Sequence, residues 1–405
     1  MPLQKGNLLI GQSGGPTPVI NASLAGVLSE AKKMPEIDRI YGMKNGIEGA
    51  LKKEVYDLTE EPDDLVGKLL HTPASALGSC RHKLSKDEEY EQLLELFKAN
   101  NIRYFVYIGG NDSMDTCDKI SKLAQKRSYD MQVIGVPKTI DNDLPVTDHC
   151  PGFGSAARFV ALATVESGRD LEAMKTFDDV TIFEIMGRHA GWLTAASALG
   201  KKCEEDAPHL IYLPERTFDE EKFLKDVKDV HDKLGYVYVT LCEGIVDKDG
   251  EFIGSKNAEI DAFGHKAVSM SDGPAAYLAK VIKDKLGIKV RINRPGTIQR
   301  SSAALASKTD VDEAFMAGKA AVENFSKGIS DVMITLERVP GKEYQIVIGK
   351  TPLENAANVE KFMPDNFINE AGNFVTKEFY DYCLPLIGDP ILDYARITGK
   401  PIKLK

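Results

Sequence analysis

The stretch RYFVYIGGNDSMD, residues 103–115, shows the local sequence pattern that recurs along the chain. Its first half is an apolar run of the kind that forms a strand buried on both faces, and two glycines then permit a tight turn. The polar residues that follow begin a helical segment, so we expect a strand, a turn and a helix in succession. A helix that begins behind a glycine turn suits a phosphate, because its free N–H groups point toward the ligand.

Asn111 and Asp112 stand at the mouth of this turn, where a carboxylate would repel a phosphate. Asn and Asp are favoured at helix starts, and an acid in the first turn complements the helix dipole, so both residues can be explained as caps. The alternative is that they take part in a ligand site. The local sequence leaves these two interpretations about equally open.

The same rhythm of a short apolar run followed by a longer amphipathic segment recurs along the chain. Apolar runs such as NLLIG, MQVIGVPK, DVTIFEIMG, PHLIYLP and YVYVTLCEG precede helical segments expected at 14–33, 112–127, 154–174, 189–201, 219–234 and from about Asp272. The pattern predicts an α/β protein with mainly parallel sheets and helices on both faces. A length of 405 residues exceeds one typical core, so two doubly wound units are expected. The polar segment 247–265 is predicted to be a loop or small hairpin.

Composition narrows the function classes. The formal net charge of -10 argues against a nucleic-acid or anionic-membrane surface, which would need clustered Lys and Arg. The six cysteines include no Cys-x-x-Cys pair, so neither a zinc ribbon nor a disulfide framework is indicated. The chain shows no signal-peptide pattern and no apolar run of the roughly 20 residues needed to span a bilayer. We therefore expect a cytoplasmic protein.

Ligands of doubly wound sheets collect at the carboxyl ends of the strands, where two further motifs stand. In GQSGGPTPVINAS, residues 11–23, Gly14 and Gly15 free the backbone for close approach, and a helix is expected to begin near Thr17. The loop lacks the Lys-Ser/Thr of a Walker motif, and an ordinary turn explains it equally well. In GVPKTIDNDLPVTDH, residues 135–149, Asp141 and Asp143 lie two apart behind Lys138. One carboxylate can accept a proton while the other holds a metal or orients its partner.

Arginines mark two more loops. Arg188 follows a predicted strand in EIMGRHAGW, and Arg291, Arg294 and Arg300 lie within ten positions in RINRPGTIQRS. Arginine binds phosphate through two parallel hydrogen bonds, so three arginines beside a glycine turn favour an anion site. Glu243, at the end of another predicted strand, can accept hydrogen bonds from sugar hydroxyls.

These motifs, in this order, resemble the phosphofructokinase family: two glycine loops, a Thr-Ile-Asp-Asn-Asp loop, a Met-Gly-Arg loop and an Ile-Gln-Arg turn. The matches run from Gly11 to about Lys319. The resemblance implies two Rossmann-like lobes with the active site between them. The phosphoryl-donor lobe would comprise residues 1–152 plus about 300–355, and the sugar-phosphate lobe residues 153–299 plus about 356–405.

The resemblance also implies a role for each matching residue. Asp141 would be the general base for the 1-hydroxyl of fructose 6-phosphate. The other catalytic residues would be Lys138, Thr139, Asp143 and Asp112. The phosphoryl donor would contact Gly14, Gly15, Arg81 and Gly110. The sugar phosphate would contact Thr139, Ile140, Asp141, Met186, Gly187, Arg188, Glu243, Arg291, Thr297 and Arg300. Arg291 matches an arginine that the family supplies from a neighbouring subunit, so a homo-oligomer, dimer or tetramer, is expected.

Asp112 and Lys138 decide the expected donor. In ATP-using relatives both positions are glycine, whereas pyrophosphate-dependent members carry charged side chains there. The resemblance therefore implies reversible transfer from pyrophosphate, with Asp112 excluding ATP and Lys138 meeting the transferring group. An ATP-dependent sugar-phosphate kinase and a non-catalytic sugar-phosphate sensor are the alternatives, and Asp141, Arg188 and Arg300 argue against the sensor.

The expected cofactor is Mg²⁺, held by Asn111 and Asp112. Three positions depart from the family pattern. Asn111 stands where an acidic residue is usual, Thr297 replaces a histidine or tyrosine beside the sugar phosphate, and Asp179 replaces a second intersubunit arginine.

Overall fold

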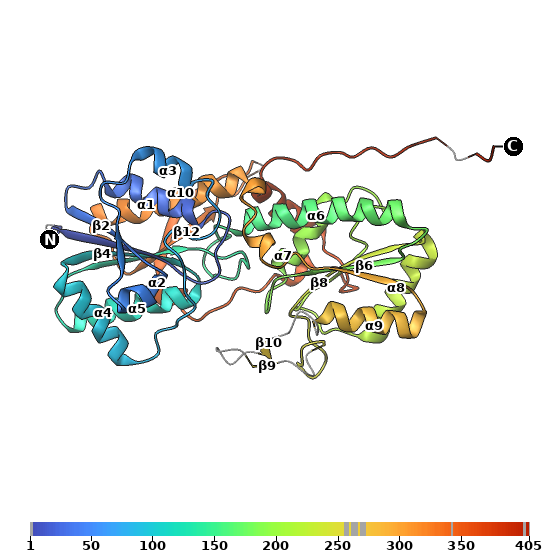
Figure 1. Cartoon of the computed structure of the whole chain (residues 1–405), viewed down its shortest axis with the longest axis horizontal. Helices are drawn as coiled ribbons and strands as arrows, with labels where there is room; N and C mark the ends of the chain where they lie inside the picture. The colour runs from blue at the N-terminus through green and yellow to red at the C-terminus, as the bar shows by residue number, and fades with distance from the viewer. Residues whose placement is uncertain are drawn as a thin grey trace.

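The computed structural model describes residues 3–254, 273–341, 343–399 and 402–404, with the backbone alone of 259–260 and 266–267. Two lobes lie side by side, each built on a sheet with helices packed against it (Figure 1). The strands are β1 (Gly6–Gln12), β2 (Ile37–Met43), β3 (Val55–Asp57), β4 (Ile102–Gly109), β5 (Gln132–Pro137), β6 (Val180–Ile185), β7 (Leu210–Tyr212), β8 (Val237–Cys242), β9 (Glu259–Ile260), β10 (Lys266–Ala267), β11 (Val290–Asn293), β12 (Val332–Arg338) and β13 (Ile346–Pro352).

The helices connect these strands. They are α1 (Ile20–Ala31), α2 (Gly46–Leu51), α3 (Asp63–Leu69), α4 (Asp87–Ala99), α5 (Asn111–Lys126), α6 (Phe153–Met174), α7 (Trp192–Ala195), α8 (Glu220–Leu234), α9 (Pro274–Leu286), α10 (Lys308–Ser326) and α11 (Lys377–Cys383). Short 3₁₀ helices are η1 (Ala196–Gly200), η2 (Gly296–Arg300), η3 (Ala303–Leu305), η4 (Leu353–Asn355), η5 (Asp365–Phe367) and η6 (Leu384–Ile387).

The larger sheet has the order β13-β12-β5-β4-β1-β2-β3. Its inner strands run parallel, and only the edge strands β3 and β13 are antiparallel to their neighbours. Side chains of β1 alternate between two cores: Leu8 and Ile10 pack with α1 and α10, while Leu9 packs with α4 and α5. Because neighbouring side chains point to opposite faces, a strand covered on both sides must be apolar at every position, as the sequence pattern predicted.

The smaller sheet has the order β11-β6-β8-β7, with every strand parallel. It is also buried on two faces. Val239 of β8 packs with α8 and α9, and the adjacent Tyr238 packs with α6 and α11. The mainly parallel α/β fold expected from the sequence is confirmed, and all parallel strands of each sheet direct their following loops to one edge.

Helices α6 and α10 meet where the lobes join. Asp310 of α10 accepts the N–H groups of Gly152, at 2.9 Å, and of Ser155, at 2.8 Å, at the start of α6. The strands of the larger sheet come from within residues 6–137 and 332–352, and those of the smaller sheet from within 180–293. The predicted lobe boundaries stay a prediction.

The strand, turn and helix expected at residues 103–115 are β4 and α5. The first helix differs, since α1 begins at Ile20 rather than near Thr17. Pro16 and Pro18 explain the delay, because a residue that precedes proline is driven out of the helical region. Of the predicted loop or hairpin 247–265, part lies outside the described residues; β9 within it pairs antiparallel with β10. Asp272 also lies outside the described residues, and α9 starts two positions later.

Helices α1 and α10 cross with their backbones almost touching. A Cβ atom on Gly26 would lie 2.1 Å from the backbone oxygen of Phe315, and one on Gly318 would lie 1.9 Å from that of Ser23. Real Cβ atoms do not approach backbone so closely, so each glycine is needed for this helix contact.

We predict that Gly26→Ala lowers the free energy of unfolding by roughly 1–3 kcal/mol, because the added methyl group must push α1 away from α10. Gly67→Ala is the matched control, since Gly67 is also inside a helix but has open space around its Cβ position. There the higher helix propensity of alanine should raise stability by about 0.5–1 kcal/mol. Urea denaturation measures both changes, and equal gains in both variants would contradict the close-packing explanation.

Candidate active site

The turn after β5 is shaped by its own polar side chains. Thr139 Oγ1 accepts the N–H of Asp141 at 3.0 Å. Asn142 has a φ of 55°, in the left-handed region that Asn tolerates better than most residues. Its amide nitrogen donates to the hydroxyl of Tyr382 at 2.9 Å, and its side-chain oxygen accepts the N–H of Cys150 at 3.0 Å. These bonds fix the two aspartates that flank Asn142.

Asp141 is the carboxyl on which the charges of this region converge. Burial and the nearby carboxylates of Asp143 and Glu243 together raise its pKa to about 7, against the opposing effect of the cations of Lys138 and Arg300. Asp141 follows β5 of the larger sheet and Glu243 follows β8 of the smaller one. Both lobes therefore contribute charge to one carboxyl, which can exchange a proton near neutral pH.

Lys138 joins the two loops of the larger sheet. It is 4% exposed, and its Nζ donates to the backbone oxygen of Gly15 at 2.9 Å. Burial lowers its pKa to about 8, although Asp141 and Asp143 act in the opposite direction. Gly14 has a φ of 71°, and a Cβ atom there would lie 3.3 Å from Lys138 Nζ. Both the conformation and the space therefore favour glycine in this loop.

Arg300, at the end of η2, approaches the same glycine loop. Its NH1 atom would lie 2.8 Å from a Cβ atom on Gly15. Burial lowers its pKa, the positive charge of Arg81 lowers it further, and Asp141 and Glu243 raise it. Its Nε is buried and has no hydrogen-bond partner among the described residues. A buried donor without an acceptor costs free energy, which a bound phosphate oxygen would recover.

The loop after β6 is held against Glu243 and η2. Gly187 has a φ of 144° and donates its N–H to Glu243 Oε1 at 3.3 Å. Burial raises the pKa of Glu243, and the charge of nearby Arg188 opposes the rise. Gln299, which is 1% exposed, accepts the N–H of Met186 at 3.1 Å. Gln299 was not among the predicted site residues, although it lies in the Ile-Gln-Arg turn that carried the resemblance.

The first turn of α5 bears on the two interpretations of Asp112. The N-cap of α5 is Gly110, with no side-chain cap bond, and Asn111 Oδ1 accepts the N–H of Asp112 at 2.8 Å. The carboxylate of Asp112 instead lies 2.6 Å from Lys83 Nζ. Asn111 thus acts locally on the helix start, whereas Asp112 is paired with a different segment. This geometry favours a role for Asp112 beyond capping.

Two predicted sugar-phosphate residues are exposed, and one of them, Arg291, lies apart from the others. Arg291 pairs with Asp178 at 2.8 Å, and its side chain is 54% exposed. It aligns with Thr181, five positions before Met186, which is roughly 16 Å along a strand. Arg291 therefore lies toward the end of its sheet opposite the candidate site of its own chain. Thr297 is exposed on η2.

The carboxylate oxygens near these loops are suitable ligands for Mg²⁺. Among the described residues no group of three or more His, Cys, Asp and Glu side chains is arranged to hold a metal ion. Mg²⁺ commonly binds through one or two carboxylates, with phosphate oxygens and water completing its shell, so such a group is not required. Burial raises the pKa of Asp143, because a charged carboxylate is unfavourable away from water. A nearby cation would offset that cost. Asp143 therefore supplies a carboxylate of a suitable kind, whereas that of Asp112 is paired with Lys83.

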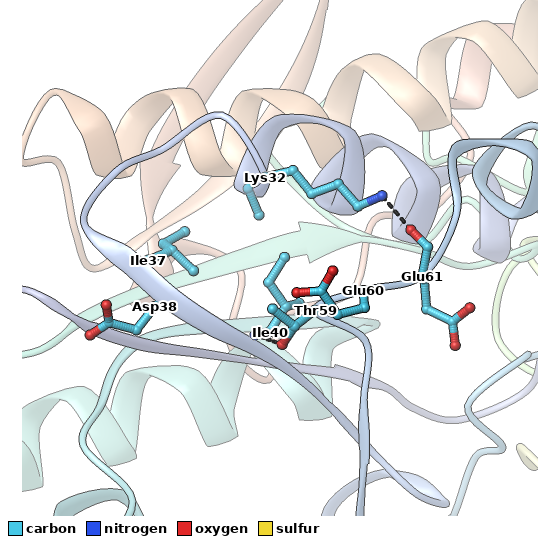
Figure 2. A pocket seen from close by; sticks show the side chains of 8 residues that line it. Lys32, Ile37, Asp38, Ile40, Thr59, Glu60 and Glu61 are labelled. Atoms are coloured by element: carbon cyan, nitrogen blue, oxygen red, sulfur yellow. Dashed lines mark hydrogen bonds between the residues drawn. The ribbon is translucent and has the colours of Figure 1, made fainter.

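A surface cavity of about 400 Å³ lies away from these residues, between the end of α1 and the start of β2 (Figure 2). Its rim carries Lys32, Asp38, Glu60 and Glu61, and Lys32 donates to the backbone oxygen of Glu61. The cavity is at the amino end of β2, whereas doubly wound sheets bind ligands at the carboxyl ends. No predicted site residue lines it, so it is not part of the candidate site.

Several known proteins resemble this chain over nearly its whole length. The phosphofructokinase family pattern matches residues 7–325. The pyrophosphate–fructose 6-phosphate 1-phosphotransferase of Xanthomonas campestris pv. campestris is 44% identical over 399 residues, which cover 97% of this chain and 94% of that protein. The protein of the same name from Rhodospirillum rubrum is 44% identical over 98% of both chains. The crystal structure of pyrophosphate-dependent phosphofructokinase from Nitrosospira multiformis is 41% identical, covers 99% of each chain and superposes with a TM-score of 0.87.

The raised pKa of Asp141 predicts a pH-dependent stability change. The folded state holds the Asp141 proton up to about pH 7, whereas the unfolded chain releases it near 3.8, so ionisation costs stability increasingly between these values and constantly above them. Asp141→Asn removes that cost. Its gain in Tm over wild type should therefore be larger at pH 8 than at pH 5, by roughly 2 °C or more. Asp229→Asn, on the exposed face of α8, is the control. A gain for Asp141→Asn that does not depend on pH would show that the carboxyl ionises normally.

Proposed function

This chain belongs to the phosphofructokinase family, and from that membership we propose how the residues around Asp141 and Lys138 carry out its reaction. The chain is an enzyme that transfers a phosphoryl group from pyrophosphate to the 1-hydroxyl of fructose 6-phosphate. The products are fructose 1,6-bisphosphate and phosphate, and the reaction is reversible because donor and product have similar phosphoryl potential. The observation that carries the proposed roles is that Asp141 and the buried Lys138 lie in one neighbourhood, where both pKa values are shifted toward neutrality.

Asp141 is the general base. Its carboxylate takes the proton of the 1-hydroxyl while the hydroxyl oxygen bonds to the terminal phosphorus of pyrophosphate. The bond from that phosphorus to the bridging oxygen breaks, and phosphate leaves with the electron pair. A pKa of about 7 leaves a large share of Asp141 ionised at neutral pH and lets it return the proton in the reverse direction.

Positive charge stabilises the transferring group. Phosphoryl transfer depends on positioning and charge neutralisation, which Lys138 and Arg81 supply beside the N–H groups of the glycine loops. Thr139 holds the aspartate turn, and Asp143 lies next to the base. Bound Mg²⁺ would neutralise charge on the donor oxygens, and we assign it to Asp143 together with the donor. The carboxylate of Asp112 is already paired with Lys83, and the side-chain oxygen of Asn111 accepts the N–H of Asp112.

The loops of the smaller sheet bind the sugar phosphate. Arg300 offers its unpartnered buried Nε to the 6-phosphate, which supports this assignment. Glu243 accepts hydrogen bonds from the sugar hydroxyls, and Met186, Gly187 and Arg188 line the sugar phosphate beside it. Ile140, which is 6% exposed, packs beneath the turn rather than presenting a polar group to the ligand.

Assembly and location complete the proposal. The exposed position of Arg291, toward the strand end remote from its own site, supports a homo-oligomer in which it serves a neighbouring subunit. The six cysteines are all free, as expected of a protein in a reducing compartment such as the cytoplasm. No helix among the described residues combines the length and apolar character required to cross a bilayer.

A coupled assay with purified protein, Mg²⁺ and fructose 6-phosphate tests the function. We expect product from pyrophosphate and far less from ATP supplied in parallel. In the reverse direction, pyrophosphate should form from fructose 1,6-bisphosphate and phosphate. Asp141→Asn should fold, bind both substrates and lose turnover by roughly 10² or more, because the side chain keeps its shape and loses its basicity. Asp229→Asn should behave as wild type. Near wild-type turnover of Asp141→Asn would remove Asp141 from the role of base.

Asp112→Gly tests donor exclusion. Glycine removes both the charge and the volume that would meet a nucleotide, so measurable ATP use should appear. The kcat/KM for pyrophosphate should fall less, because Lys138 is unchanged. Adding Lys138→Gly should then lower pyrophosphate turnover by roughly 10²-fold or more, the scale of one preorganised electrostatic contact. If a folded, active Asp112→Gly variant keeps the wild-type ratio of ATP to pyrophosphate kcat/KM, Asp112 does not select the donor.

A further inference from the structure

Lys83 is a basic residue beside the donor loops that none of the roles above uses. It lies two positions after Arg81, in the segment whose Cys80 oxygen accepts the N–H of Gly14 at 3.1 Å. Its Nζ donates to Asp112 Oδ1 at 2.6 Å and to Asn358 Oδ1 at 3.3 Å. The only side chain of the helix start that carries negative charge is thus held by a cation from another loop.

Asn358 is itself fixed in place. It comes from the segment between η4 and η5, and its φ of 56° is in the left-handed region. Its amide nitrogen donates at 2.9 Å to Asp115 Oδ1, a buried carboxylate one turn after Asp112 on α5. Asn358 therefore bridges α5 and Lys83, and its carbonyl oxygen sets where the ammonium group can lie.

The segment that carries Asn358 is tied to the rest of the site. The next residues include Glu360, whose carboxylate lies 3.0 Å from His189 Nδ1 in the loop after β6. Lys361 donates its backbone N–H to the backbone oxygen of Asp143 at 2.7 Å. The segment that carries Asn358 therefore links the position of Lys83 to that of the aspartate turn.

An exposed ion pair adds little to stability, so a Lys83–Asp112 pair held by a third side chain needs another explanation. A free carboxylate at Asp112 would repel pyrophosphate as well as ATP. A paired one keeps its volume but loses most of its repulsion. Resting on the donor proposed above, we infer that Lys83, oriented by Asn358, is a positioning residue for donor recognition: it neutralises Asp112 toward pyrophosphate and holds its side chain in the space that a nucleotide would need.

The test is a double-mutant cycle on the binding of magnesium pyrophosphate, measured by calorimetry on the full chain without acceptor. Lys83→Met should weaken binding about 10-fold or more when Asp112 is present, and less than about 3-fold in an Asp112→Asn background. Lys83→Arg should recover most of the affinity. Lys119→Met is the matched control, because Lys119 pairs with Asp115 on the same helix and its loss removes the same charge from the protein. Its effect on binding should stay below about 3-fold.

The melting temperature of each variant separates positioning from folding, and Lys83→Met should melt close to wild type. Equal losses of affinity in both backgrounds would mean that Lys83 meets the donor directly, and no loss would mean that it is a bystander; either result overturns the inference. A wild-type protein that binds no magnesium pyrophosphate would refute the proposed donor and this inference with it. A wild-type protein that binds, with additive losses, would refute the inference alone.

Discussion

The structure depends on keeping a carboxylate and an ammonium group together where water reaches them poorly. Burial drives the pKa of Asp141 up and that of Lys138 down, so each group becomes able to exchange a proton near neutral pH. Neither shift could arise on an isolated loop. Glu243 and Arg300 also act on Asp141 from outside the larger sheet, because the two parallel sheets send their loops toward one place. The apolar strands beneath, buried on both faces, supply the rigidity that keeps these charges in position.

That position is secured from a distance along the chain. Asn142 lies in a left-handed conformation between the two aspartates, and its side chain is held by Tyr382 in α11. The hydroxyl of Tyr382 in turn donates to the backbone oxygen of Asp148 at 2.8 Å. The C-terminal part of the chain is therefore a structural support for the aspartate turn, and a residue far from the reacting atoms helps to set the direction of Asp141.

The sequence predicted the parallel architecture well because burial on both faces forces a continuous apolar run, as at Leu8, Leu9 and Ile10. It also marked the loops that meet, since glycine, aspartate and arginine at strand ends are chemically conspicuous. It placed the start of α1 too early, because Pro16 and Pro18 hold the residues before them outside the helical region. It missed Asn358, since a lone asparagine carries no local pattern, and its importance comes only from contacts with Lys83 and Asp115. Such long-range partners are set by tertiary packing and have no short motif.

The proposed donor end of the site includes Lys83, Asp112 and Asn358, which come from three separate stretches of the chain. A loop that is transplanted into a relative would carry one of these residues and leave the other two behind. An isolated Asp112 in such a chimera would then face the donor without its counter-charge. On the proposed role of Asp112, a redesign of donor preference must therefore move all three segments together. The contiguous glycine motif alone does not carry the charged partners that we propose make it selective.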